Sequence, residues 1–63
     1  MKEYLGKSCK LHISPKKDIN LYYTVKEVTA ISDKHITFID KYNKVYTFRV
    51  IDVVEANPLS EKL

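Results

Sequence analysis

A chain of 63 residues with a net charge of +3 has room for one small domain. A domain of this size buries only about 60% of the surface that its unfolded chain exposes, so nearly every strongly apolar residue is needed for the core. This excludes a large enclosed active site, because pockets for drug-sized ligands occupy roughly 300–1,000 Å³.

The cysteine content favours a reducing environment. Cys9 is the only cysteine, so no disulfide can form within the chain, whereas small secreted domains usually carry several. The N-terminal residues lack the apolar run of a signal peptide, and no stretch approaches the ~20 apolar residues that cross a bilayer. We therefore expect a cytoplasmic protein that does not associate with membranes.

The first predicted strand covers residues 7–14 and follows Gly6, the only glycine. Apolar and polar residues alternate along it, as in a strand with one buried face. Pro15 is expected to break this strand, because proline has no N–H to donate to a ladder. The side chains expected to face the core are Cys9, Leu11 and Ile13, and those expected to face solvent are Lys10, His12 and Ser14.

A longer strand is predicted over residues 20–32, with a change of phase in its middle. One extra residue near Lys26 and Glu27 would return the later apolar residues to the inner face, which is what a β-bulge supplies. A bent, bulged second strand is what a small barrel needs to turn its corner. The residues assigned to the inner face are Leu21, Tyr23 and Val25 before the bulge, and Val28 and Ala30 after it.

The remaining elements are shorter. A third strand is predicted over residues 35–40 and a fourth over 45–50, joined by a hairpin in which Asn43 can adopt a left-handed conformation. The mixed spacing of apolar residues in 51–56 predicts one tight helical turn and a short closing strand. The expected inward residues are Ile36, Phe38, Tyr46, Phe48 and Val50, with Val53 in the closing strand. The domain is expected to span residues 1–57, and residues 58–63 form a C-terminal tail.

Five short strands with tight connections predict an all-β domain that closes into a small barrel, because closure removes exposed edge strands. Several segments resemble those of SH3-like and Sm-like small barrels. They are Leu5-Gly6-Lys7-x-Cys9-x-Leu11, Val25-x-x-Val28-x-x-Ile31, Ile36-Thr37-Phe38, and Tyr46-Thr47-Phe48 followed by Asp52-Val53. The resemblance covers roughly residues 5–56 and implies a five-stranded SH3-like barrel.

The chain departs from both kinds of barrel at their functional motifs. SH3 domains that bind proline-rich peptides carry a tryptophan and acidic residues in the first long loop. This chain has no tryptophan, and its loop at residues 15–18 reads Pro-Lys-Lys-Asp. Asp40 and Asn43 only loosely resemble the RNA-binding signature of Sm proteins, and the second Sm motif is missing. Neither known ligand class is therefore expected from the resemblance.

The sequence contains no convincing catalytic or metal-binding set. Cys9 and His12 lie three apart in a strand and so point to opposite faces, which separates a thiol from its base. Together with His35 they make a poor zinc site, because structural zinc usually takes four ligands with close spacing. Asp33 and Asp40 flank a strand and are expected roughly 20 Å apart. We predict no enzyme activity, no cofactor and no bound metal.

Lysines and tyrosines are the candidate binding residues. Residues 1–17 carry five lysines and one glutamate, a balance of +4, whereas residues 18–63 carry six basic and seven acidic groups. Tyr22 is expected to be exposed because its neighbour Tyr23 belongs to the inner face. Exposed tyrosines beside lysines can stack bases while the lysines meet phosphates, or can anchor a protein interface, or can merely cover the ends of a barrel. The candidate partner-binding or nucleic-acid-binding residues are Lys10, Lys16, Lys17, Tyr22 and Tyr42.

These observations favour a non-enzymatic binding module that takes a protein partner. The abundance of Lys, Ile, Asn and Tyr is typical of low-GC bacterial genomes, so we expect an accessory or regulatory protein of such a bacterium or of its mobile elements. The alternative is a nucleic-acid-binding barrel that uses its basic N-terminal strand and loop. We expect a monomer, and an Sm-like ring joined through edge strands is a third possibility.

Overall fold

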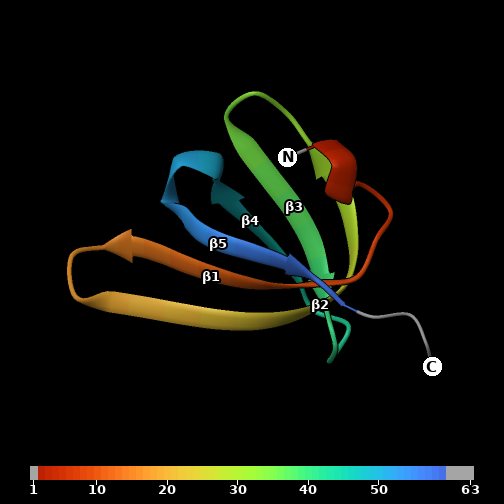
Figure 1. The fold of residues 1–63 in the computed structure, drawn as a ribbon, viewed down its shortest axis with the longest axis horizontal. Coiled ribbons are helices and arrows are strands. Elements are labelled where there is room, and N and C mark those ends of the chain that lie inside the picture. Colours follow the sequence, from red (N-terminus) through yellow and green to blue (C-terminus); the bar gives the residue numbers. More distant parts are fainter. Residues whose placement is uncertain (1, 60–63) are drawn as a thin grey trace.

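The computed structural model describes residues 2–59 and shows an all-β fold (Figure 1). Its five strands form a single antiparallel sheet, and two single turns of 3-10 helix accompany them. The all-β class, the five strands and the helical turn before the last strand are therefore confirmed. The elements are η1 (Lys2–Tyr4), β1 (Cys9–Lys16), β2 (Ile19–Ile31), β3 (His35–Asp40), β4 (Val45–Arg49), η2 (Val50–Asp52) and β5 (Val53–Pro58).

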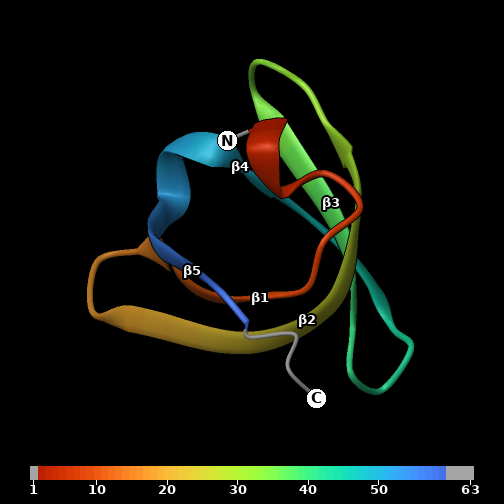
Figure 2. The same ribbon diagram turned by 45° about the vertical axis from the view of Figure 1, so that its right-hand side comes forward.

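The sheet is strongly bent, and its strand order is β4-β3-β2-β1-β5. Figures 1 and 2 show that β1 and β2 form a long hairpin, while β3 and β4 cross it steeply. Within residues 2–59 no ladder joins β4 to β5, so these two strands are the sheet edges, and η2 links them in the chain. No helix in this part of the chain is long and apolar enough to cross a membrane.

Strand β2 is bulged twice against β3. The pairing shifts between Val25 and Glu27, which confirms the predicted bulge. A second shift between Val28 and Ala30 returns Ile31 to the core side and leaves Ala30 exposed. The expectation that Ala30 faces the core is therefore wrong, because a second extra residue changes the phase again. Each bulge adds local twist, and together they bend the longest strand around the core.

Pro15 lies inside β1 and does not end it. The β1–β2 pairing passes from Ile13 opposite Leu21 to Lys16 opposite Ile19, with an irregularity between. Proline is tolerated where a strand bulges, since no ladder hydrogen bond is required from its nitrogen there. The expected break at Pro15 is therefore wrong. Strand β5 in turn runs through Pro58, and residues 60–63 of the predicted tail lie outside the described residues.

The core lies on the concave face of the bent sheet, which curves around it. The predicted inward phase of the first strand is confirmed, and so is the burial of four other residues assigned to the inner face, Val25, Val28, Ile36 and Phe38. Phe48 and Val53 are only partly buried. They lie on the edge strands β4 and β5 and pack against the margin of the core. The fully buried apolar residues are Cys9, Leu11, Ile13, Val25, Val28, Ile36 and Phe38.

The N-terminal segment is fixed on the sheet. Gly6 adopts a left-handed backbone conformation with φ of 78°, and its N–H donates to the carbonyl oxygen of Val28 at 2.8 Å. The Tyr4 hydroxyl donates to the carbonyl oxygen of Ala56 at 3.0 Å, and its ring packs against the core. Tyr4 is therefore a structural residue, which connects the start of the chain to β5.

Burial predicts an unreactive thiol at Cys9. The side chain is fully buried, and burial raises the pKa of the thiol above its ordinary value. We expect a thiol reagent to label the native protein far more slowly than the unfolded chain, because the reactive species is the thiolate. Lys17→Cys, at an exposed turn, supplies a second thiol that should react rapidly. Rapid labelling of Cys9 in the native wild-type protein would contradict the assigned phase of β1.

Candidate binding surface

The outer face of β5, β1 and β2 carries two rows of polar and aromatic side chains. Ladder pairing places neighbouring strands in register, and directly opposite residues in a sheet have Cβ atoms about 4.5–5.5 Å apart. These residues alternate with buried ones along β1, so their side chains point away from the core. We call the set the outer array: Asn57, Lys10 and Thr24 form one row, and Glu55, His12 and Tyr22 form the next.

Within the outer array, Tyr22 is a highly exposed aromatic residue that stacks on a neighbouring ring. The residue is 73% exposed, and one face of its ring stacks on the imidazole of His12 with 4.4 Å between centroids and 21° between planes. Nε2 of His12 is hydrogen-bonded to Oδ1 of Asn20 at 2.8 Å. The imidazole is thus held from two sides, and it orients a tyrosine ring that otherwise lies in solvent.

Two grooves meet at Tyr22. The first has a volume of about 340 Å³ and runs over β1, and we call it the β1 groove. The second has a volume of about 370 Å³ and lies between β2 and the β3–β4 hairpin, and we call it the tyrosine groove. The β1 groove is lined by Lys10, Leu11, His12, Tyr22, Tyr23, Thr24, Glu55 and Asn57. The tyrosine groove is lined by Tyr22, Tyr23, Thr24, Asp40, Lys41, Tyr42 and Tyr46.

The β3–β4 hairpin is held by the carboxylate of Asp40. Its Oδ1 accepts the backbone N–H of Tyr42 at 2.8 Å and that of Lys44 at 3.0 Å. Asn43 has a φ of 65°, which places it in the left-handed region as predicted. This turn presents Tyr42, which is 70% exposed and whose ring centroid lies 5.2 Å from Nζ of Lys41. Asp40 therefore builds one wall of the tyrosine groove.

The floor of the tyrosine groove is aromatic. Tyr23 and Tyr46 pack with 4.8 Å between ring centroids, and Tyr23 lies 5.3 Å from Phe38 in the core. Desolvation raises the pKa of the Tyr23 phenol, and the neighbouring Tyr46 and Asp40 raise it further. The groove thus joins the hydrophobic core at its base, with the nearly buried Asp40 in its wall and the exposed Lys41 at its rim.

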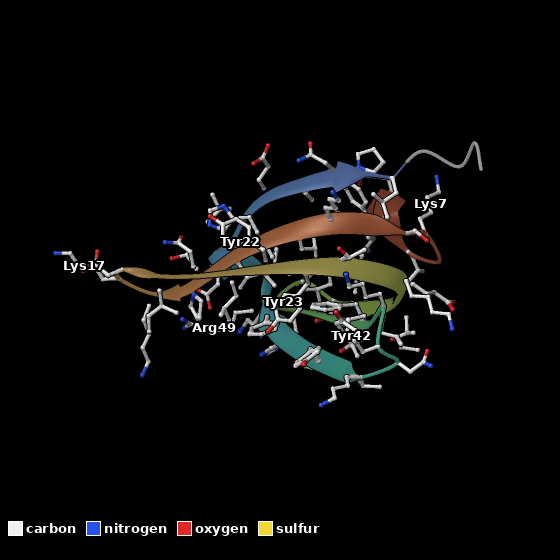
Figure 3. The ribbon with its side chains drawn as sticks, turned by 90° about the horizontal axis from the view of Figure 1, so that it is seen from below. Lys7, Lys17, Tyr22, Tyr23, Tyr42 and Arg49 are labelled. Carbon is white, nitrogen blue, oxygen red and sulfur yellow. The ribbon has the colours of Figure 1, made fainter. Side chains whose placement is uncertain are left out.

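The structure separates the candidate lysines. Lys10 lies in the outer array beside Tyr22, whereas Lys16 and Lys17 lie at the tip of the β1–β2 hairpin. Lys10 and Lys16 are six residues apart in one strand, roughly 20 Å at about 3.3 Å per residue. Figure 3 shows Lys17 at the far end of the hairpin, well away from Tyr42. Of the five candidate residues, Lys10, Tyr22 and Tyr42 gather around the two grooves.

Other residues of the surface were missed at the level of sequence. Glu55 and Asn57 join the array because β5 pairs with β1, a contact between residues more than 40 positions apart. Tyr46 and Lys41 enter the tyrosine groove only through the fold of the hairpin. Alternation placed each residue on a face, but nothing in the sequence indicated that the closing strand pairs with the first.

The cysteine, histidines and carboxylates considered for metal binding do not come together within residues 2–59. Cys9 is buried and His12 faces outward, as their spacing predicted. No three His, Cys, Asp or Glu side chains in residues 2–59 gather closely enough to hold a metal ion. Asp52 is engaged by Arg49, whose Nε and Nη2 lie 3.0 and 3.2 Å from its two carboxylate oxygens. That pair stabilises the turn at η2.

Comparison of the chain with models of protein families, with curated proteins and with solved structures yields no match.

Proposed function

We propose that this chain is a non-enzymatic binding module of the SH3-like kind, which recognises a protein partner through the surface around Tyr22. The observation that carries the proposal is the position of Tyr22, a 73% exposed residue whose ring is oriented by His12 and which lines both grooves. Tyrosine is among the residues most enriched at interface hot spots. A ring already held in one orientation also loses less conformational freedom when a partner binds.

The charges around the grooves favour a protein over a polyanion. The β1 groove holds Lys10 and Glu55, and the tyrosine groove holds Lys41 and Asp40, so each has one group of either sign. A nucleic acid would meet a carboxylate in both grooves, whereas a protein surface can offer groups of both signs. The basic residues at the hairpin tip lie too far away to neutralise these carboxylates. We further propose a cytoplasmic, accessory or regulatory role.

Partner capture tests the class of ligand. The full chain carrying an affinity tag is recovered from its own host with and without nuclease treatment. A co-purifying protein is then produced separately and titrated into the untagged chain by calorimetry. We expect a defined protein that survives nuclease treatment and binds with fixed stoichiometry. Loss of every partner on nuclease treatment, or failure of the isolated protein to bind, would contradict the proposal.

A second candidate function is binding of single-stranded nucleic acid, which the proximity of Lys10 to Tyr22 in the β1 groove favours. If Lys10, Lys16 and Lys17 all meet phosphates, log K should fall with log salt at a slope of about −2, since each contact contributes about −0.7. The double variant Lys16→Ala/Lys17→Ala should remove a little more than one unit of slope, about 1.4. Tyr22→Ala should weaken binding by ~1–3 kcal/mol and leave the slope unchanged, because stacking releases no counterions.

The measurement is a fluorescence titration of a labelled single-stranded oligonucleotide over a series of salt concentrations. Non-specific electrostatic attraction is strongest at low salt. Absence of binding by the wild-type protein under that condition would eliminate the second candidate and leave the protein-binding proposal standing.

A further inference from the structure

We propose that the tyrosine groove is a binding site for a cationic side chain, and that a protein partner inserts an arginine into it. The source of the arginine rests on the proposed function, whereas the site itself is tested without any partner. The observations that carry the proposal are the nearly buried Asp40, whose carboxylate has one oxygen without a hydrogen bond, and the tyrosines that line the same groove.

Asp40 is only 6% exposed as a residue. Its Oδ1 accepts two backbone N–H groups, but its Oδ2 makes no hydrogen bond or ion pair within residues 2–59. No polar side-chain atom in this part of the chain is both fully buried and without a partner, so Oδ2 is not completely enclosed, and Asp40 lines the groove. A carboxylate removed from water is strongly stabilised by a charged N–H donor.

The surrounding rings favour the same kind of ligand. The faces of tyrosine rings attract cations, and this attraction grows when water is excluded. A guanidinium group is planar, is weakly hydrated, stacks on aromatic rings and donates to carboxylates, so arginine suits this groove better than lysine. Tyr22, Tyr23, Tyr42 and Tyr46 line this groove, and the ring of Tyr42 already makes a cation–π contact with Lys41.

The chain's own Lys41 already occupies part of this site. Its Nζ lies 5.2 Å from the centroid of the Tyr42 ring, in a cation–π contact. Lys41 is exposed, so an incoming cation can displace it. It competes with a cationic ligand and would assist an anionic one. Removal of its charge therefore distinguishes the two: a cation should bind more tightly to Lys41→Ala, and a phosphate group more weakly.

The site is tested by NMR titration of the ¹⁵N-labelled full chain with N-acetyl-arginine amide at constant ionic strength. The matched probe is N-acetyl-citrulline amide, which has nearly the same shape and no charge. We expect saturable shifts at the amides of Thr24, Lys41, Tyr42 and Tyr46 with the arginine probe, none with citrulline, and weaker binding of N-acetyl-lysine amide. Equal shifts with arginine and citrulline would overturn the proposal.

Variants connect the binding to Asp40. Asp40→Asn keeps an oxygen that can accept the two backbone N–H groups but removes the charge, and should weaken binding about tenfold or more. Asp33→Asn makes the same chemical change at an exposed bend outside both grooves and should leave the affinity unchanged. Unchanged affinity in a folded Asp40→Asn protein, judged from the dispersion of its spectrum, would overturn the proposal.

Two further variants keep Asp40, so they test the site even if Asp40→Asn disturbs the β3–β4 hairpin. Tyr42→Leu removes an exposed ring and should weaken binding, and Lys41→Ala should strengthen it. Unchanged affinity in Tyr42→Leu, or weaker binding in Lys41→Ala, would each overturn the proposal. Saturable arginine binding in a protein that captures no protein partner would leave this site standing while the proposed function fails. A protein partner that binds the Asp40→Asn variant as tightly as the wild type would leave the proposed function standing and contradict the insertion of an arginine into this groove.

Discussion

Replacing Phe38 with alanine is expected to unfold the domain or bring it close to unfolding. The ring is fully buried, and its centroid lies 5.3 to 6.1 Å from those of Tyr23, Tyr46 and Phe48. Removal of a buried phenylalanine ring typically costs ~3–5 kcal/mol. A domain this small is expected near the lower end of the ~5–15 kcal/mol range of folding stabilities. Urea denaturation followed by circular dichroism measures the loss.

A pair of isoleucines supplies the matched control for this prediction. Ile36 is fully buried, whereas Ile51 is 80% exposed, and mutation to alanine removes the same atoms from both. Ile36→Ala should cost about 2–5 kcal/mol, and Ile51→Ala should change stability by no more than about 0.5 kcal/mol. A Phe38→Ala protein that unfolds cooperatively with a near-normal midpoint would show that the phase of β3 is wrong.

Replacing Tyr22 with alanine is expected to raise the dissociation constant for the protein partner about 30-fold or more, which corresponds to ~2 kcal/mol, the usual threshold of an interface hot spot. The reason is the position of the ring, which borders both grooves and is held by His12. Calorimetric titration of the variant with the purified partner measures the change.

Two controls separate this binding effect from an effect on stability. Tyr22→Ala also removes the stacked pair with His12, so its unfolding free energy is measured in parallel and is expected to fall by only about 0.5–1.5 kcal/mol. Tyr22→Phe keeps the ring and should retain most of the affinity. Wild-type affinity in a folded Tyr22→Ala protein would place the partner elsewhere.

Alternation was sufficient to predict the face of most strand residues. In β1 the inward residues Cys9, Leu11 and Ile13 are buried as predicted, since a two-residue period leaves no other choice once one face is apolar. The pattern failed where the backbone inserts extra residues. Only one phase change in β2 was visible in the sequence, because Ala30 and Ile31 are both apolar and either could have faced the core.

The candidate surface was predictable residue by residue but not as a site. The exposure of Tyr22 and Tyr42 followed from alternation and from the hairpin. Lys16 and Lys17 were grouped with Lys10 because they are near in sequence, yet an extended strand moves residues apart rapidly. The role of Asp40 depends on a turn whose backbone N–H groups converge on one oxygen, and that convergence is a property of the folded hairpin.

The position of the partner tests the central proposal most directly. A photo-reactive benzoyl-phenylalanine is placed at position 22 in one sample and at position 51 in another, and each is irradiated with the purified partner. Both positions are exposed, but position 51 lies in η2, between the edge strands β4 and β5. The proposed surface predicts an abundant cross-link from position 22 and little or none from position 51. A cross-link from position 51 alone would move the binding surface to the sheet edge and contradict the proposed role of Tyr22.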